Sequence, residues 1–275
     1  MTRQTAAAAP REIGETVTNL SRLPADAAAP ERDPEMKPTD LTPADAGSPA
    51  RVRTPGRRGR PPKTAGASDT SALILDVAED LFSKHGLHGV SIRDVANEAG
   101  VDTALLHYYF GTKRGLFDAV FSRRSEILNA DRLAALDAYE RDKGEAMTPE
   151  GVIEAFLRPL LEWGEKGGPG WKHYFALISQ ANANPIWGGE MMARNFDTVI
   201  RRLIDLMRKA IPGARDEDLY WAYHNLSGAL TLTIGETGRL DRLSNGLCRS
   251  GDLKTAHANM ARFAAAGFRA LCARA

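Results

Sequence analysis

The sequence holds only two cysteines, Cys248 and Cys272, among 275 residues. Two thiols cannot build a disulfide framework or, by themselves, a four-ligand zinc site. They are typical of a reducing compartment, so we expect a cytoplasmic protein. We expect neither a metal nor another cofactor.

Long apolar runs are also lacking. No run reaches the roughly 18 residues that a membrane span needs, and the first twenty residues lack the continuous apolar core of a signal peptide. We therefore expect no membrane partner.

Neither sign of charge is in excess, since 36 Lys and Arg against 35 Asp and Glu leave a net charge of only +1. Apolar residues make up 43% and charged residues 26%. These values are near the globular average and exclude a wholly disordered, collagen-like or strongly basic chain. At about 150 residues per domain, the length fits one or two domains.

Residues 1–67 differ from the rest because ten of the 15 prolines lie there and large apolar residues are scarce. Such a segment cannot bury enough apolar surface to offset its chain entropy, so we expect a disordered tail. Met36 is a second candidate for the true start. The tail ends in a basic arm, where Arg58-Gly-Arg60-Pro resembles an AT-hook. A narrow A/T minor groove attracts arginine, so we expect this arm to contact DNA; a solvated linker is the alternative.

The remainder has the periodicity of helices. Apolar residues at three- to four-residue spacing from Leu73 to Phe82 predict a first helix. Ser91, with Asp94 at the capping-box position, predicts the start of a second, short helix. Asp102 and Thr112 predict the starts of a third and a fourth.

The C-terminal part carries longer helical patterns and no convincing strand alternation. The patterns cover roughly 149–166, 170–183, 188–210, 215–240 and 252–273. We therefore predict an all-α fold, with a three-helix head over 68–115 and a larger helical body over 116–275.

The second and third helices, joined at Gly100, have the form of a helix-turn-helix. The B-DNA major groove is about 12 Å wide and admits one α-helix. A short helix can enter it only when another helix braces it from behind. Periodicity turns Leu106, Tyr109 and Phe110 inward, and leaves an outward face for DNA. That face consists of Thr103, Ala104, His107 and Tyr108.

The stretch VSIRDVANEAGVDTALLHYYFGTK, from Val90 to Lys113, followed by Gly115-Leu-Phe117, resembles the head of the tetracycline-repressor (TetR) family of bacterial regulators. The close match covers Leu73 to Phe121. The resemblance implies a homodimer that binds a palindromic operator in double-stranded DNA. It also implies release of the operator when a small molecule enters the body.

The resemblance assigns roles to single residues. It implies that Thr103 and Ala104 read bases and that Arg93 reaches a base edge or a phosphate. It implies contacts with phosphates, sugars or thymine methyls for His107 and Tyr108, and phosphate contacts for Lys113 and Ser91. His107 departs from the family, which usually has tyrosine there. Asp102 is interpreted as a helix cap, since an acid close to phosphate is repelled.

An effector cavity should be apolar with a few polar groups. The candidates for its lining are Phe156, Leu160, Trp163, Tyr174, Ile178, Met192, Phe196, Trp221, His224 and Asn225. His224 and Asn225 lie in an apolar helical pattern, where polar side chains need a partner, either a ligand or other side chains. We expect an apolar or amphipathic effector, such as a fatty acid, an acyl thioester or an aromatic compound. The resemblance places the dimer interface on the last two helices, with internal core packing as the alternative.

The leading interpretation is a ligand-responsive repressor. One alternative is an architectural DNA-binding protein that is anchored by its AT-hook and has no effector. A helical enzyme is the other, and the absence of a phosphate loop, a nucleophile elbow and an HExxH motif argues against it.

Overall fold

The computed structural model describes residues 67–273, which belong to one compact unit. The predicted tail, its basic arm and Met36 lie outside the described residues. Within 67–273 every regular element is a helix, so the all-α prediction is confirmed. The elements are α1 (Ala67–His85), α2 (Ile92–Ala99), α3 (Thr103–Phe110), α4 (Lys113–Lys143), the 3-10 turn η1 (Gly144–Ala146), α5 (Pro149–Lys166), α6 (Pro169–Asn182), α7 (Gly188–Ala210), α8 (Asp216–Ile234), α9 (Arg239–Leu243) and α10 (Leu253–Cys272).

The three N-terminal helices, of which α2 and α3 are short, pack around one small apolar core. Ile74 and Phe82 of α1 meet Val95 of α2 and Leu106 of α3, and all four side chains are buried. Phe117 of α4 completes this core, with its ring edge-on to Phe82 at 5.1 Å between centroids. The head therefore depends on the first turns of α4 as well as on its own three helices.

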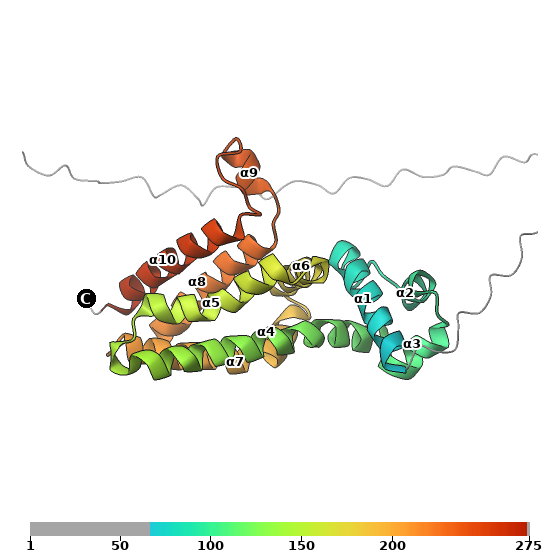
Figure 1. The fold of residues 1–275 in the computed structure, drawn as a ribbon, viewed down its shortest axis with the longest axis horizontal. Coiled ribbons are helices and arrows are strands. Elements are labelled where there is room, and N and C mark those ends of the chain that lie inside the picture. Colours follow the sequence, from blue (N-terminus) through green and yellow to red (C-terminus); the bar gives the residue numbers. More distant parts are fainter. Residues whose placement is uncertain (1–66, 274–275) are drawn as a thin grey trace, which may run out of the picture. The chain divides into compact units, whose positions relative to one another are not determined.

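Helix α4 crosses the predicted boundary at residue 115 without a break (Figure 1). It packs against α1 at its start and against α5 and α7 further along. Head and body thus share one continuous helix, which gives a direct mechanical connection between them.

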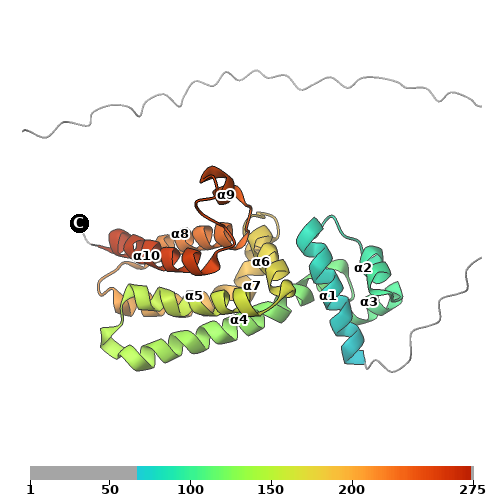
Figure 2. The same cartoon turned by 45° about the horizontal axis from the view of Figure 1, so that its top comes forward.

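The body consists of α4 to α8 and α10. Helix α10 packs along both α5 and α8, and α6 packs against α7 and α8 (Figure 2). Tyr174 and Trp171 of α6 are buried at its centre, with the Tyr174 ring 5.5 Å from that of Phe121. The body helices follow the predicted ranges closely, apart from one.

The predicted helix over 215–240 is wrong at its C-terminal end. Helix α8 stops at Ile234, and the chain turns through positive φ angles at Glu236 (40°) and Gly238 (66°) before the short α9. These left-handed conformations cannot continue an α-helix. The apolar residues that follow belong to α9, which projects from the body (Figure 1).

Candidate nucleic-acid interface and internal cavity

Helix α2 is fixed at its start by the predicted capping box, which is confirmed. The Ser91 hydroxyl accepts from the Asp94 backbone N–H at 3.1 Å, and the Ser91 backbone N–H donates to the Asp94 carboxylate at 2.8 Å. The Ser91 hydroxyl also donates to that carboxylate at 2.7 Å. These hydrogen bonds from Ser91 hold the pKa of Asp94 below its usual range. In the free protein, the hydroxyl proton of Ser91 is therefore already engaged.

Gly100 makes the turn between α2 and α3. Its φ of 67° is left-handed, a conformation that glycine adopts without strain. Its N–H donates to the carbonyls of Ala96 and Asn97, and the N–H of Val101 donates to Ala96. The turn therefore satisfies the last carbonyls of α2 while starting α3 in a new direction.

Helix α3 presents a polar and aromatic surface to solvent. Asp102 caps it as predicted, accepting from the Ala104 N–H at 2.8 Å. Leu106 is fully buried, whereas Ala104 and His107 are exposed and Tyr108 is 81% exposed. An aromatic side chain that exposed has no role in the core, so it is available to a partner.

The remaining predicted contact residues border this face. Thr103 is half-buried at the first position of α3, and Arg93 is exposed on α2. Lys113 is half-buried at the first position of α4, directly after Thr112, whose hydroxyl accepts from the Gly115 N–H at 3.0 Å and caps the helix as predicted. Arg58 and Arg60 lie outside the described residues.

His107 has a defined tautomer in this arrangement. Its Nδ1 lies 2.8 Å from the carbonyl oxygen of Gly111. Because a carbonyl oxygen only accepts, Nδ1 carries the proton and donates it. The Nε2 atom is then left for contacts outside the protein.

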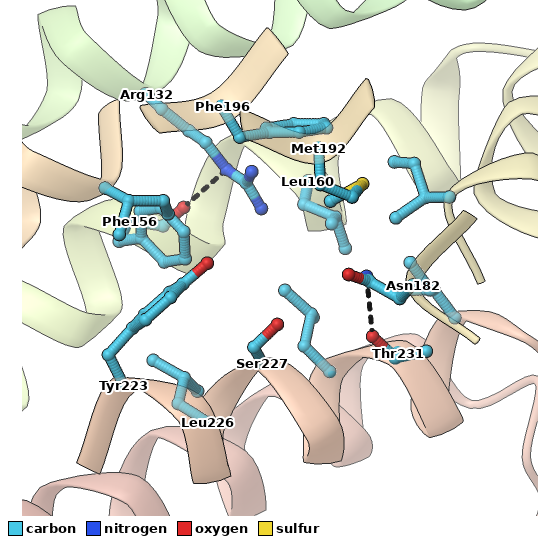
Figure 3. A pocket seen from close by; sticks show the side chains of 14 residues that line it. Arg132, Phe156, Leu160, Asn182, Met192, Phe196, Tyr223, Leu226, Ser227 and Thr231 are labelled. Carbon is cyan, nitrogen blue, oxygen red and sulfur yellow. Dashed lines mark hydrogen bonds between the residues drawn. The ribbon is translucent and has the colours of Figure 1, made fainter. Parts of the chain in front are cut away.

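The body encloses a small internal cavity of about 30 Å³ (Figure 3). Helices α4 to α8 line it, and most of the lining is apolar. Five of the predicted effector residues lie together here: Phe156, Leu160, Ile178, Met192 and Phe196.

The other predicted effector residues lie elsewhere. Tyr174 is buried in the core beside the cavity, and burial raises its pKa. Trp163 stacks on Trp171 at 4.4 Å and donates from Nε1 to Asp131 at 2.8 Å. A second group, Trp221, His224 and Asn225, is on the exposed side of α8.

The sequence predicts that His224 and Asn225 need a ligand or other side chains as partners. Both are exposed in the structure, and His224 lines a surface hollow of about 430 Å³ together with Ser227 and Thr231. Helix α8 turns Leu219, Ala222 and Leu226 toward the core, which points its 221, 224 and 225 positions to solvent. Because α8 carries apolar residues on both sides, the sequence pattern does not show which side faces the core.

Sequence reasoning missed the polar residues of the cavity, which are Arg132, Asn182, Tyr223, Ser227 and Thr231. Arg132 of α4 is only 3% exposed and lies one turn from the buried Leu128 and Leu136. An arginine at four-residue spacing between two core leucines was the available signal.

The guanidinium of Arg132 has few partners. Its Nε donates to the Phe156 carbonyl at 3.2 Å, and its centre lies 4.2 Å from the Phe156 ring centroid. Its Nη2 has no hydrogen-bond partner in the structure. Burial lowers the pKa of Arg132 to about 10 because desolvation disfavours the charged form.

A second buried charge joins the head to the body. Glu79 of α1 is 1% exposed and accepts hydrogen bonds from two arginines of α4: Arg124 Nη2 at 2.6 Å and Arg123 Nη2 at 3.1 Å. The Arg124 guanidinium also lies 5.3 Å from the ring centroid of Trp171 in α6. Helix α6 contacts α1 again where the Gln180 amide donates to the Ser83 carbonyl at 2.8 Å.

None of the described helices is long and apolar enough to cross a membrane. Across residues 67–273, no cluster of His, Cys, Asp and Glu side chains is placed to hold a metal ion.

Two families of known proteins match the chain in its two halves. Residues 74–120 match the family described as bacterial regulatory proteins, tetR family. Residues 154–267 match the family described as tetracyclin repressor-like, C-terminal domain. The first match spans the helix-turn-helix, and the second spans most of α5 and all of α6 to α8, which line the cavity together with α4.

Curated relatives are named as transcriptional regulators. The HTH-type transcriptional repressor KstR2 of Rhodococcus jostii RHA1 is 32% identical over 160 residues, which cover 52% of this chain and 74% of that protein. The HTH-type transcriptional regulator RutR of Escherichia coli K12 is 34% identical over 111 residues, 40% of this chain. The chain spans only about half of the length of RutR, 46%.

A solved structure has the same fold. The TetR-like transcriptional regulator from Rhodococcus sp. RHA1 superimposes with a TM-score of 0.51 over 78% of this chain and 100% of that one, at 19% sequence identity. The likeness at this identity concerns the fold alone.

Proposed function

Since the chain belongs to the TetR family of DNA-binding transcriptional regulators, we propose that it is a ligand-responsive repressor. It binds an inverted-repeat operator as a homodimer and leaves the operator when a small effector enters the body. DNA is its macromolecular partner, and its relatives are regulators rather than enzymes.

The observation that carries the proposal is the outward face of α3. Ala104, His107 and Tyr108 are exposed on a helix that Leu106 anchors and α2 braces. A braced short helix with an exposed polar and aromatic face fits the major groove, and Lys113 lies at the edge of this face, where a phosphate contact is expected. The repressor role is supported by the name of KstR2, which is a repressor.

A homodimer is supported by apolar side chains left uncovered on α8 and α10. Trp221 of α8 is 58% exposed, and Phe263 and Leu271 of α10 are 70% and 43% exposed. The two helices lie side by side, so a second copy would cover both in one four-helix interface. An inverted repeat needs two heads related by a two-fold axis, which such an interface provides.

Replacing Phe263 with alanine is expected to weaken the dimer by about 2–3 kcal/mol, since a truncated aromatic anchor is lost once from each copy. Sedimentation equilibrium over a dilution series measures the change. Ala258, exposed on the same helix, gives the control variant Ala258→Ser, which should leave the dissociation constant unchanged. A dimer that tolerates Phe263→Ala would place the interface elsewhere.

The effector would act through helices that both line the cavity and contact α1. Helix α4 carries Arg132 in the cavity and Arg124 on Glu79, and α6 carries Asn182 in the cavity and Gln180 on Ser83. A ligand that favours one arrangement of these helices shifts the equilibrium between two head positions, of which one fits the operator.

The test of this function is selection of random double-stranded DNA on the purified full chain at near-physiological salt. We expect an enriched inverted repeat. Enrichment of A/T tracts without symmetry would instead favour the architectural alternative, in which the basic arm dominates. No enrichment of any sequence would reject both.

The basic arm contributes a separate expectation. Replacing Arg58 and Arg60 with alanine should reduce the slope of log affinity against log salt by up to about two phosphate equivalents, because fewer counterions are released. Operator titrations at a series of salt concentrations measure this slope. An unchanged slope would make the arm a linker.

A further inference from the structure

Arg132 is a buried cation without a buried anion to match it. Among the described residues, no carboxylate forms an ion pair with it, and the buried carboxylate of Glu79 pairs with Arg123 and Arg124 instead. The guanidinium keeps its proton at neutral pH, because its pKa of about 10 remains well above 7. A buried charge of this kind is costly unless an anion and hydrogen bonds compensate it.

The protein uses only part of the guanidinium. The Nε edge donates to the Phe156 carbonyl and one face covers the Phe156 ring, while Nη2 has no partner. A structural role, bracing the backbone of α5 near Pro159, accounts for the Nε contact. It does not account for the unpaired Nη2.

Two hydroxyls of α8 converge on the same space. Figure 3 shows that Tyr223 and Ser227 point their oxygens into the cavity that the Arg132 guanidinium enters. Burial raises the pKa of Tyr223 and its interaction with the Ser227 hydroxyl opposes this rise. A phenol is a proton donor at neutral pH. Two neutral donors beside a cationic fork match the geometry that binds a carboxylate.

The apolar side chains around this space line two separate cavities. A second one, of about 20 Å³, shares Leu160, Leu230 and Ile234 with the first, and its lining is apolar apart from Thr233 and His257. Each cavity has room for about one water molecule.

The first cavity also shares Asn182, Ser227 and Thr231 with a surface hollow of about 430 Å³, so a ligand gains room by displacing the side chains between these spaces. Joined, the two cavities give a polar end at Arg132 and an apolar end toward α10.

We propose that Arg132 is the anion-binding residue of the effector site, and that the effector is a monocarboxylic acid with an apolar chain or ring. The inference rests on the proposed function and selects, among apolar and amphipathic compounds, those with a free carboxylate. The carboxylate pairs with Nη2 and accepts from Tyr223 and Ser227. The apolar part occupies the space between α5, α8 and α10.

The position of Arg132 connects this site to the head. Arg124, which holds Glu79 of α1, precedes Arg132 by eight residues on the same helix. Eight residues span about 12 Å of α-helix. A carboxylate that draws Arg132 toward α8 therefore moves a rigid element whose other end is fixed to the head.

The experiment compares acids with their uncharged counterparts on the full chain. The probes are straight-chain acids of six to twelve carbons and 3-phenylpropanoic acid, each paired with its methyl ester and with the alkyl phosphate of equal length. Thermal unfolding and calorimetry measure binding without DNA, and operator release is measured separately. We expect at least one acid to bind at least tenfold more tightly than its ester and its phosphate.

The variants separate anion binding from a structural role. Arg132→Met replaces the unpaired charge by an apolar side chain of similar length, and we expect it to retain or raise thermal stability while losing at least tenfold in acid affinity. Tyr223→Phe removes one hydroxyl donor without changing the ring and should weaken acid binding alone. Arg158→Met, which changes an exposed arginine of α5 outside both cavities in the same way, is the matched control and should leave acid affinity unchanged.

Three outcomes would overturn the proposal: no acid binds, acid and ester bind equally, or Arg132→Met binds the acid as the parent does. If Arg132→Met loses thermal stability and Tyr223→Phe binds the acid as the parent does, Arg132 is assigned to bracing α5 and not to anion binding. Acid binding without a specific operator would leave the anion site standing and reject the proposed function. If the protein selects a specific operator but binds no acid, the anion site is rejected and the proposed function stands.

Discussion

Replacing Glu79 with alanine is expected to lower the free energy of unfolding by about 3–5 kcal/mol, the cost of removing one partner from a buried ion pair. Glu79 is almost completely buried; its Oε2 accepts from Arg123 and Arg124, and its Oε1 accepts from Arg124 Nε. The variant leaves both guanidiniums beside an apolar gap. Urea unfolding followed by far-ultraviolet circular dichroism measures the loss.

The same change should also uncouple the head from the body. Glu79 is the point where α1 holds α4, and Arg124 extends the contact to Trp171 of α6. Variants that remain folded should therefore bind operator less tightly and respond less to an effector.

Asp76 provides the matched control. It pairs with Arg123 at 2.8 Å on the same face of α1, but its side chain is 65% exposed. An exposed ion pair contributes about 0–1 kcal/mol, so Asp76→Ala should be nearly neutral. Equal losses from the two variants would show that the burial of Glu79 does not set its contribution.

The combined substitution of Tyr108 and Lys113 by alanine is expected to weaken operator binding by about 4 kcal/mol, roughly 1,000-fold. The estimate takes about 1 kcal/mol for each lost contact and counts each contact twice in a homodimer. Fluorescence anisotropy with the selected operator at fixed salt measures the affinity.

This loss should come without a loss of structure. Tyr108 is 81% exposed, and its only ring contact is edge-on to Tyr109 within the described residues. Helicity and the urea midpoint should therefore match those of the parent. Lys172→Ala, which removes an exposed lysine of α6 in the body, is the control and should keep full affinity. Unchanged affinity in the double variant would reject the docking of α3 in the major groove.

The head could be predicted almost completely because its signals are local. Capping by Ser91, Asp102 and Thr112 depends on residues two or three positions apart. The turn at Gly100 depends on the freedom of a single glycine. The inward and outward faces of α3 follow from the helical period within eight residues. Such features can be predicted from the sequence because no residue distant in the chain is needed to fix them.

The lining of the internal cavity could be predicted only in part. Apolar periodicity placed Phe156, Ile178 and Phe196 on inward faces, and the structure brings these together. It failed for α8, because Trp221 on the exposed side is as apolar as Leu226 on the buried side. When both faces of a helix carry apolar residues, only the neighbouring helices decide which face is covered.

The sequence by itself determined the helical class, the helix starts and the exposed face of α3, since these follow from spacing over a few residues. Only the tertiary structure decided which groups are the partners of each buried charged side chain. Glu79 became the connection to two arginines more than 40 positions away, whereas Arg132 was buried with its Nη2 unpaired. The pairing of a buried charge depends on which helices meet across the core. That packing depends on contacts throughout residues 67–273, so spacing over a few residues does not determine it.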